Sequence, residues 1–511
     1  MGFTGIIYAI CVCILIFTAA SWLRKQRARW PYPPGPSGLP IVGNTFQVPL
    51  TEQWLKYAEW AKTYGDVMHL SVLGRSIIVL SSASAISDLL DKRSVHYSDR
   101  PVVPMAGEMV GFSRYIALEH YGGRLKEGRK LITNSLSTRN MPEVQRMQEM
   151  KVIHLVSRLM SSPADFRLNL RWFMASVVFQ YSHGYEVETF EDYYVKLAEQ
   201  VAEDFSRAVQ PGKFLVDSLP FLMHVPDWMP GTGFKATAGA MAERLQRLAD
   251  ESYHHVQTQV ARGTAPPSFT ANLIENNPHP TPDEEDMYKT TAMVFYVAGA
   301  DTTTSVLEAL FLAMTLYPDI QQKAQAEVDR VVGFDRLPNF SDRLQLPYVE
   351  GLIKEIYRLN QVFPLALPHC ATQDGVYAGY HIPEKSIVIA NSWAVVHDPA
   401  LYPQPFDILP ERYLKQEDGL NPDPRCFTFG YGRRVCPGQR LADDSVFIVT
   451  ATVLATLDIC QTLGPDGLPI KPKATFGGGA VCHPGPFECT ITPRSIDAER
   501  LVIHAASALV G

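Results

Sequence analysis

One short loop constrains this 511-residue chain more than any other segment: it runs from Phe427 to Gly438 and reads FTFGYGRRVCPG. Its cysteine, Cys436, lies between glycines at 432 and 438, which permit a tight turn because they carry no Cβ. Backbone N–H groups just after a cysteine can point at its sulfur and tune its basicity. A single cysteine is most often a buried, inert thiol. The four fixed companions of Cys436 favour a ligand-binding loop instead.

Read from Phe429, the loop has the pattern Phe-x-x-Gly-x-Arg-x-Cys-x-Gly. This pattern resembles the loop that gives cytochrome P450 enzymes their haem thiolate. The resemblance implies that Cys436 is the axial ligand of the iron of haem b, and that Arg434 reaches an acidic group of this cofactor. A thiolate on haem iron pushes electron density onto the metal and favours O–O cleavage. The two glycines would then let the backbone approach the porphyrin closely.

Composition and charge fit a large globular protein and disfavour other classes. Apolar residues make up 46% of the chain and charged residues 19%, which is ordinary for a protein with a large core. The net charge of −7 argues against a nucleic-acid binder. The eight cysteines are irregularly spaced and predict neither a disulfide framework nor a zinc ribbon. Cys482 and His483 are adjacent, a poor spacing for metal ligands, so we interpret both as structural.

The N-terminal segment predicts a membrane anchor followed by a hinge. Residues 1–23 carry no charged side chain and could cross a bilayer as one helix. Basic residues follow at once: Arg24, Lys25, Arg27 and Arg29. A secretory signal has the reverse order, so we expect an uncleaved, single-pass anchor with the rest of the chain in the cytosol. Residues 24–44 form a basic flank and a proline-rich hinge, which predicts a semi-rigid spacer. Microsomal P450s of the endoplasmic reticulum have a similar hinge.

Residues 45–511 predict one α-rich domain with a small β portion, which the resemblance identifies as the cytochrome P450 haem domain. Helical periodicity covers 141–160, 193–209, 239–262 and 287–317. Apolar, β-branched segments at 68–72 and 76–80 predict a hairpin that turns at Leu73-Gly74. A second β-rich region spans 375–390 with a turn at Gly379, and a third, irregular pair joins 474–481 with 487–491.

A polar cluster, Asp301 and Thr302, interrupts the apolar helical pattern of 287–317. β-Branched threonine lowers helix propensity, and its hydroxyl can bond to a carbonyl one turn earlier. Such a local violation indicates a functional site, although a kinked core helix fits the pattern too. In P450s the matching segment passes over the distal haem face. There Thr302 would hydrogen-bond the reacting oxygen, Asp301 would relay protons from solvent, and Gly299 would admit a flat ligand.

Three charged residues match the family's buried charge network. Glu355 and Arg358 form Glu-x-x-Arg, which places both charges on one helical face. That pattern alone is common on exposed helices. The resemblance adds Arg412 from Pro-Glu-Arg-Tyr, where Tyr413 stands in place of the family's phenylalanine. We expect the network to support the haem pocket rather than take part in the reaction.

Two further residues match the family's partners for the haem propionates. Arg129 occupies the arginine position of the Trp-x-x-x-Arg pair, and His369 falls where another partner is placed. A surface-loop histidine is the alternative for His369. Leu125 stands at the tryptophan position, so one indole N–H donor is missing from the expected grip on the propionates.

Substrate contacts can be assigned only by position in the family. The candidates are mostly apolar and suit a lipophilic molecule held by shape: Phe295, Ala298, Phe363, Leu365 and Phe476. Core packing predicts the same composition. Apolar clusters at 221–223 and 228–229 suggest contact with the membrane interface, through which such a substrate could enter.

Together the motifs imply a membrane-anchored monooxygenase. O2 would bind opposite Cys436, and one oxygen atom would enter a C–H bond of a lipophilic small molecule. The chain has no Gly-x-Gly-x-x-Gly after a strand, so electrons would come from NADPH-cytochrome P450 reductase, with cytochrome b5 as a second donor. Segments 390–394 and 429–434 and the segment around His483-Pro484 resemble fungal P450s of secondary metabolism, which implies a terpenoid, polyketide or alkaloid pathway. Two alternatives stay open: a peroxide-using haem-thiolate isomerase or dehydratase, which the Asp301–Thr302 pair disfavours, and a non-catalytic haem protein that binds a ligand.

Overall fold

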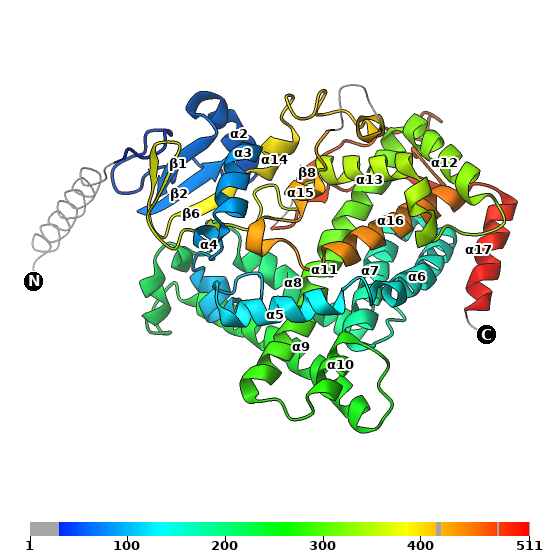
Figure 1. The fold of residues 1–511 in the computed structure, drawn as a ribbon, viewed down its shortest axis with the longest axis horizontal. Coiled ribbons are helices and arrows are strands. Elements are labelled where there is room, and N and C mark those ends of the chain that lie inside the picture. The colour runs from blue at the N-terminus through cyan, green and yellow to red at the C-terminus, as the bar shows by residue number, and fades with distance from the viewer. Residues whose placement is uncertain (1–29, 415–420, 478–479, 510–511) are drawn as a thin grey trace, which may run out of the picture. The chain divides into compact units, whose positions relative to one another are not determined.

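A computed structural model describes residues 30–414, 421–477 and 480–509, and in these residues the chain is mainly helical with a small β portion, as predicted (Figure 1). The chain divides into two compact units. Unit 1 comprises the described residues of Met1–Val102, Phe363–Ala400 and Gly430–Val435, and unit 2 those of Val103–Val362, Leu401–Phe429 and Cys436–Gly511. Among the described helices, none is both long and apolar enough to span a membrane. The predicted anchor, residues 1–23, lies outside the described part.

Unit 1 contains a four-stranded sheet in the order β1-β2-β6-β3 (Figure 1). Strands β1 (Val67–Val72) and β2 (Arg75–Leu80) form the antiparallel hairpin that the sequence predicted. Its two turn residues, Leu73 and Gly74, both have positive φ, which gives the turn the twist of the flanking strands. Strand β6 (Ile387–Ala390) runs parallel to β2, and β3 (His369–Cys370) is antiparallel to β6.

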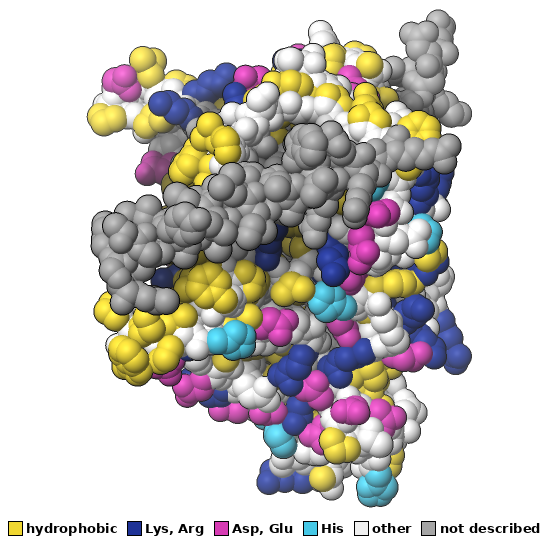
Figure 2. Space-filling model, turned by 90° about the vertical axis from the view of Figure 1, so that its left-hand side faces the viewer, with side chains coloured by type: hydrophobic (Ala, Val, Ile, Leu, Met, Phe, Trp, Pro, Cys, Tyr) yellow, Lys and Arg dark blue, Asp and Glu magenta, His cyan; other side chains and the backbone are white. Residues whose placement is uncertain are grey.

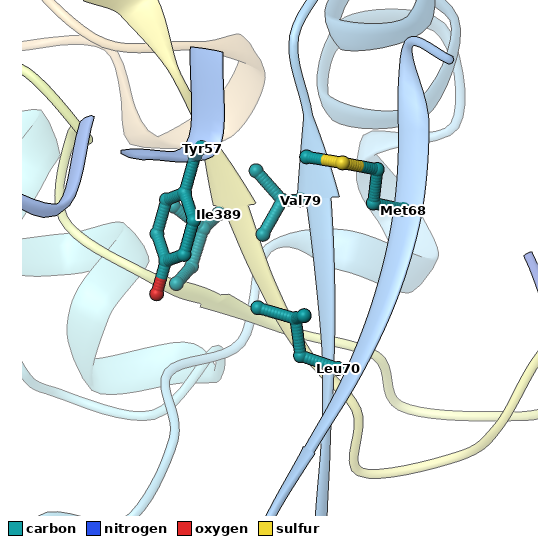
Figure 3. Packing of buried hydrophobic residues seen from close by; sticks show 5 residues of the cluster. All are labelled: Tyr57, Met68, Leu70, Val79 and Ile389. Atoms are coloured by element: carbon teal, nitrogen blue, oxygen red, sulfur yellow. The ribbon is translucent and has the colours of Figure 1, made fainter. Parts of the chain in front are cut away.

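The core of unit 1 packs on one face of this sheet (Figure 3). Met68 and Leu70 alternate with residues of the opposite face of β1, because side chains repeat every two residues along a strand. They pack with Val79 and Ile389 of the neighbouring strands and with Tyr57 of helix α2 (Gln53–Tyr64).

The remaining elements of unit 1 are short. The predicted turn at Gly379 joins β4 to β5, with φ of 81° at the glycine. The elements are α3 (Ala83–Ile86), a π-helix (Ser87–Lys92), α4 (Ser94–Tyr97), β4 (Gly375–Tyr377), β5 (Tyr380–Ile382) and α14 (Ser392–Val396).

The described part of the proline-rich hinge belongs to unit 1 and is hydrogen-bonded to other segments of that unit. Pro34 accepts a hydrogen bond from His69 N at 3.0 Å, and Pro31 accepts one from His381 N at 2.7 Å. The Tyr32 ring stacks on His69 with centroids 4.7 Å apart. Prolines lack an N–H but keep a carbonyl acceptor, so a proline-rich segment can still add to a sheet edge.

Unit 2 is built from helices, and the longest, α11 (Pro282–Leu316), has a strong start signal. The Thr281 hydroxyl accepts from Glu284 N at 3.3 Å, and the Glu284 carboxylate accepts from Thr281 N at 2.8 Å. This capping box is followed by a proline at the first helical position, where its missing N–H is not needed. Most of α11 beyond Thr303 is buried, and the helix packs against α7 (Figure 1).

The predicted helices of unit 2 are confirmed, with boundaries that differ by a few residues. They are α6 (Met141–Ser161), α8 (Tyr193–Ala208), α9 (Gly233–Ala261) and α11. The other helices of unit 2 are η2 (Pro104–Met109), α5 (Gly123–Ser135), α7 (Phe166–His183), α10 (Phe269–Asn276), α12 (Pro318–Val332), α13 (Pro347–Leu359), α15 (Arg425–Thr428), α16 (Gln439–Thr456) and α17 (Ile496–Ala508), with short 3₁₀ turns between them.

The predicted pairing of 474–481 with 487–491 is wrong. Strand β8 (Phe476–Gly477) pairs with β9 (His483–Pro484), and β10 (Thr490–Pro493) pairs with β7 (Leu457–Cys460). Hydrophobic alternation marks a strand and its buried face but does not identify its partner.

Candidate active site

The loop before Cys436 is held by its own backbone. The Cys436 N–H donates to the Phe429 carbonyl oxygen at 2.7 Å. Helix α16 begins three residues after the cysteine, and the backbone N–H groups of Gly438 and Gln439 hydrogen-bond the sulfur. A Cβ on Gly438 would lie 3.9 Å from Cys436 Sγ, in ordinary contact with it. The predicted orientation of N–H groups toward the sulfur is therefore present.

Cys436 is an exposed residue although protein surrounds its thiol. Burial is the main influence on the thiol and raises its pKa, against the lowering effects of the Gly438 N–H, the Arg129 charge and the Gln439 N–H. The residue is nevertheless exposed. A bound metal ion would remove the thiol proton outright, which burial alone opposes.

Gly432 permits the tight turn that the sequence suggested, and it also allows a close approach to a second backbone segment. Its φ is +53°, and a Cβ there would lie 2.0 Å from the Leu90 carbonyl oxygen. Its N–H donates to Asp91 Oδ1 at 2.7 Å. The close approach at Gly432 is thus to the backbone of the π-helix in unit 1, and only glycine fits there.

The middle of α11 has an accessible face in a helix that is otherwise largely buried. Ala298 is exposed and Thr302, one turn later, is half-buried. Thr302 donates its hydroxyl proton to the Ala298 carbonyl oxygen at 2.6 Å, the bond that the sequence predicted. The hydroxyl oxygen keeps lone pairs that can accept another bond. At Gly299, an added Cβ would be in ordinary contact with Val178 of α7 at 3.6 Å, so the packing of these two helices does not itself require a glycine there.

Asp301 is paired with a histidine that the sequence did not single out as functional. Its Oδ1 lies 3.2 Å from His483 Nε2. Burial raises the pKa of Asp301, but the hydrogen bond and the charge of His483 outweigh burial and lower the pKa overall. The carboxylate is therefore held in its ionised form.

In unit 1, the side chains of His369 and Arg434 bond to the carbonyl groups of two consecutive residues, Tyr97 and Ser98. His369 Nδ1 lies 2.6 Å from the Tyr97 carbonyl oxygen, and Arg434 Nε donates to the Ser98 carbonyl oxygen at 2.6 Å. Burial, followed by the charge of Arg100, lowers the pKa of His369 to about 3, and the charge of Arg434 also lowers it. His369 is thus a buried, neutral ring in a positive environment, not a surface histidine.

Sequence reasoning did not assign Arg100 to this group. Its guanidinium donates to the carbonyl oxygens of Leu367 at 2.6 Å and Pro368 at 2.7 Å, directly before His369. The side chain is buried. The pattern gave no signal for it, because only the tertiary fold brings residue 100 to the β3 strand.

In unit 2, Arg129 lies on α5, and burial lowers the pKa of its guanidinium although the charge of Cys436 raises it. Leu125, at the family's tryptophan position, is on the same helix and is 1% exposed. It packs as a core residue and offers no donor.

Glu355, Arg358 and Arg412 form a buried charge cluster within unit 2. Arg358 donates through Nε to Glu355 Oε1 at 2.7 Å and through Nη2 to Oε2 at 2.9 Å, a bidentate pair. Arg412 Nε lies 3.1 Å from Glu355 Oε1. All three side chains are almost fully buried, so each charge depends on the others.

Tyr413 completes this cluster, which a phenylalanine could not do. Its hydroxyl donates to Glu355 Oε1 at 3.0 Å. Leu409 N donates to the other carboxylate oxygen at 2.9 Å. The sequence indicated this additional hydrogen-bond donor, because it has tyrosine at position 413 where the family has phenylalanine.

The proposed substrate contacts lie in several environments. Phe295 is buried between Tyr181 and Phe269, with ring centroids 5.1 Å from each. Leu365 packs on the core of unit 1. The other positions are more accessible: Ala298 is exposed, whereas Phe363 and Phe476 are half-buried. Phe363 and Leu365 belong to unit 1, and Phe295, Ala298 and Phe476 belong to unit 2.

Comparison with known proteins identifies the family. A family model described as Cytochrome P450 matches residues 33–490. The chain belongs to the cytochrome P450 family. It is 43% identical to Cytochrome P450 monooxygenase 208 of Postia placenta over 97% of this chain and 96% of that protein. It is 40% identical to Cytochrome P450 monooxygenase claR of Ampulloclitocybe clavipes, over 96% of this chain and 91% of the relative. Identity is also 40% to Cytochrome P450 monooxygenase COX2 of Coprinopsis cinerea, with coverage of 97% and 95%.

The protein is a cytochrome P450 monooxygenase, an enzyme class that uses O2 and a small-molecule substrate. The family implies a haem cofactor, and two features of the fold fit one. Cys436 is exposed and its sulfur receives backbone N–H groups, which suit a metal-bound thiolate. His369 sits in a positive potential, which suits anionic propionates.

Proposed function

We propose that the protein is a haem-thiolate monooxygenase of the microsomal type that acts on a lipophilic small molecule. The observation that carries the proposal is the Cys436 loop: the cysteine is exposed and its sulfur accepts N–H groups at the start of α16, in a chain that matches the P450 family over residues 33–490. Cys436 would hold the iron of haem b within a haem domain of residues 45–511.

The cofactor's propionates would be bound by Arg129, His369 and Arg434. The positive potential at His369 supports this assignment. Because His369 is neutral, it would act as a hydrogen-bond partner and leave the charge to arginine. When bound, haem b activates O2, so that one oxygen atom enters a C–H bond of the substrate and the other leaves as water.

The accessible face of α11 would serve the protons of this reaction. Thr302 would accept and pass a proton through its hydroxyl, whose own proton is otherwise given to the Ala298 carbonyl. Asp301, held ionised, would take up protons from solvent and return them. Phe295, Ala298, Phe363, Leu365 and Phe476 would provide the apolar surface for the substrate.

The setting that we propose is a membrane of the endoplasmic reticulum, with residues 1–23 as the anchor and the haem domain in the cytosol. Exposed hydrophobic side chains occur on the face shown in Figure 2, and the segment between α8 and α9 exposes Leu215, Phe221 and Trp228. Such side chains suit a membrane interface. NADPH-cytochrome P450 reductase, with cytochrome b5 as a second donor, would supply electrons. The similarity of segments 390–394 and 429–434 to fungal enzymes supports a terpenoid, polyketide or alkaloid pathway.

The assignment of the ligand is tested by Cys436→Ala. We expect the variant to lose the thiolate-type absorption band of the ferrous-CO complex, because no other sulfur replaces the axial ligand. Cys460→Ala is the matched control, since Cys460 is also exposed but lies on β7. Persistence of the band in Cys436→Ala would show that another residue binds the iron.

The reaction class is tested by NADPH consumption with a fungal reductase and a panel of lipophilic substrates. We expect an oxygenated product from at least one of them. A normal ferrous-CO spectrum without any such product would favour a peroxide-using isomerase or dehydratase, or a haem protein that only binds a ligand.

A further inference from the structure

One histidine bridges two carboxylates on the same helix. His483 Nε2 lies 3.2 Å from Asp301 Oδ1, and its Nδ1 lies 3.2 Å from Glu308 Oε2. Asp301 and Glu308 are seven residues apart on α11, so they lie on one face two turns apart. A neutral imidazole has one N–H, whereas carboxylate oxygens at both nitrogens need two donors. With both carboxylates ionised, the geometry therefore requires a protonated ring.

The backbone around His483 is fixed to the same helix. Ser305 of α11 donates its hydroxyl to the Cys482 carbonyl oxygen at 2.6 Å, and Cys482 N donates to Val362 O at 2.9 Å. On the other side, Arg167 donates to the carbonyl oxygens of Pro484 at 3.2 Å and Gly485 at 2.7 Å. Hydrogen bonds thus fix the backbone on both sides of His483, and this positions the ring between the two carboxylates.

Other charged groups surround the bridge. Arg167 of α7 lies 3.9 Å from Glu308, and Arg171 of α7 lowers the pKa of Asp301 less strongly than His483 does. Arg171 is also paired with Glu199 of α8 at 3.2 Å, and Glu199 accepts from the Tyr296 hydroxyl at 3.1 Å.

The state of the ring follows from these neighbours. Burial lowers the pKa of His483, but the hydrogen bonds to Asp301 and Glu308 outweigh burial and raise the pKa to about 9. Glu308 is almost fully buried, at 2% exposure, so it anchors the ring more rigidly than Asp301, which is 27% exposed.

We propose that His483 is a positioning residue for Asp301: the ring, anchored on Glu308, holds the Asp301 carboxylate in one orientation beside Thr302. This inference rests on the proposed proton relay through Asp301. It replaces the interpretation of His483 as merely structural. We call the bridge of His483 between Asp301 and Glu308 the clamp. Loss of the clamp would free the Asp301 carboxylate to rotate, so that it would no longer be oriented for proton transfer to the reacting oxygen.

The clamp itself can be measured without turnover. In the full-length, haem-loaded protein, exchange of the His483 C2 proton for deuterium is followed against pH by peptide mass spectrometry. We expect a midpoint near 9 in the wild type, and a midpoint lower by about one pH unit or more in Asp301→Asn. His504, exposed on α17, is the internal control, and its profile should be the same in both proteins. An unchanged His483 midpoint in Asp301→Asn would overturn the proposal.

The consequence for the reaction is measured as product formed per NADPH in Asp301→Asn, His483→Gln and the double variant. We expect His483→Gln to lower this ratio by about tenfold, His483→Arg to restore part of it, and the double variant to be no worse than Asp301→Asn alone. A His483→Gln enzyme that is less heat-stable but fully coupled, or a double variant whose losses multiply, would show that His483 does not act through Asp301. If Asp301→Asn is itself fully coupled, the proton relay fails, while the exchange experiment still decides whether the clamp exists.

Discussion

Thr302 and Thr304 make the same kind of bond in different environments. Each returns its hydroxyl proton to a carbonyl one turn earlier, Thr302 to Ala298 at 2.6 Å and Thr304 to Ala300 at 2.8 Å. Thr304 is buried, whereas Thr302 lies on the accessible face of α11. If a hydroxyl is needed for proton delivery, only Thr302 can supply it.

We therefore expect Thr302→Ala to bind haem normally but to divert electrons to peroxide, with product per NADPH lower by about tenfold or more. Peroxide release and product are measured together with NADPH consumption. Thr304→Ala, which loses an equivalent backbone bond, should remain coupled. Unchanged coupling in Thr302→Ala would exclude the relay role, and equal losses in both variants would point to helix distortion.

Tyr413 offers a second test at the scale of one side chain. Its hydroxyl bonds the buried Glu355 carboxylate at 3.0 Å, where Arg358 already forms a bidentate pair. Tyr413→Phe removes one hydrogen bond to a charged group without opening the pair, which should cost about 1.5–3 kcal/mol of unfolding free energy. Glu355→Gln should cost more, about 3–5 kcal/mol, because it leaves buried arginine charge unpaired. Urea unfolding midpoints compare the two, and equal costs would contradict this ranking.

At the scale of elements, two helical glycines should respond oppositely to alanine. A Cβ at Gly128 of α5 would lie 3.4 Å from Ile116 and Thr291, which is tolerable contact. A Cβ at Gly351 of α13 would lie 2.6 Å from the Pro410 carbonyl oxygen, which cannot be accommodated without moving backbone.

Gly128→Ala should therefore stabilise the protein by about 0.5–1 kcal/mol, since alanine loses less backbone entropy on forming a helix. Gly351→Ala should destabilise it by about 1–3 kcal/mol through overpacking next to the charge cluster. Thermal unfolding of the wild type and the two variants shows whether each substitution raises or lowers the stability. A loss of stability in Gly128→Ala would mean that helix α5 has no room for a methyl group.

The elements that the sequence predicted are those specified by local patterns. The hairpin of β1 and β2 follows from alternation on both sides of Leu73-Gly74, and α11 follows from the apolar length of 287–317. Its capping box was not used in the prediction, and the helix begins at Pro282, five residues earlier than predicted. The loop of Cys436 follows from residue types at fixed spacing, because a ligand and its supporting N–H groups must be close in the chain.

The features that the sequence did not predict all depend on contacts between distant segments. His483 meets Asp301 across more than 180 residues, and Gly432 avoids the carbonyl of Leu90. Strand β10 pairs with β7 rather than with its neighbour in sequence. Spacing along the chain carries no information about such pairs, so an apparently structural histidine can be part of the site.

At the scale of the whole molecule, histidines with shifted pKa values contribute to the dependence of stability on pH. One of them is His154, whose pKa is lowered, mainly by burial. Burial lowers the pKa of both His183 and His369 to about 3, while the hydrogen bonds of His483 overcome burial and raise its pKa to about 9. In the unfolded chain a histidine titrates near pH 6.5. Below about pH 6.5 the unfolded state therefore binds more protons than the native state, because native His183 and His369 stay neutral.

Above about pH 6.5 the signs reverse for His483: the native ring keeps its proton up to about 9, while the unfolded chain loses it. The histidine contribution to stability should thus peak near pH 6.5 and fall on both sides, by up to about 1.4 kcal/mol per pH unit for each group. Urea midpoints at about pH 5, 6.5 and 8.5 test this. The measure is the slope of the urea midpoint against pH, not the absolute stability of each variant. His483→Gln should reduce the slope above about pH 6.5 and leave the slope below it unchanged. His183→Gln should reduce the slope below about pH 6.5 and leave the slope above it unchanged. If the urea midpoint of the wild type does not decrease from about pH 6.5 to about pH 8.5, the ring between Asp301 and Glu308 is not protonated in the native state.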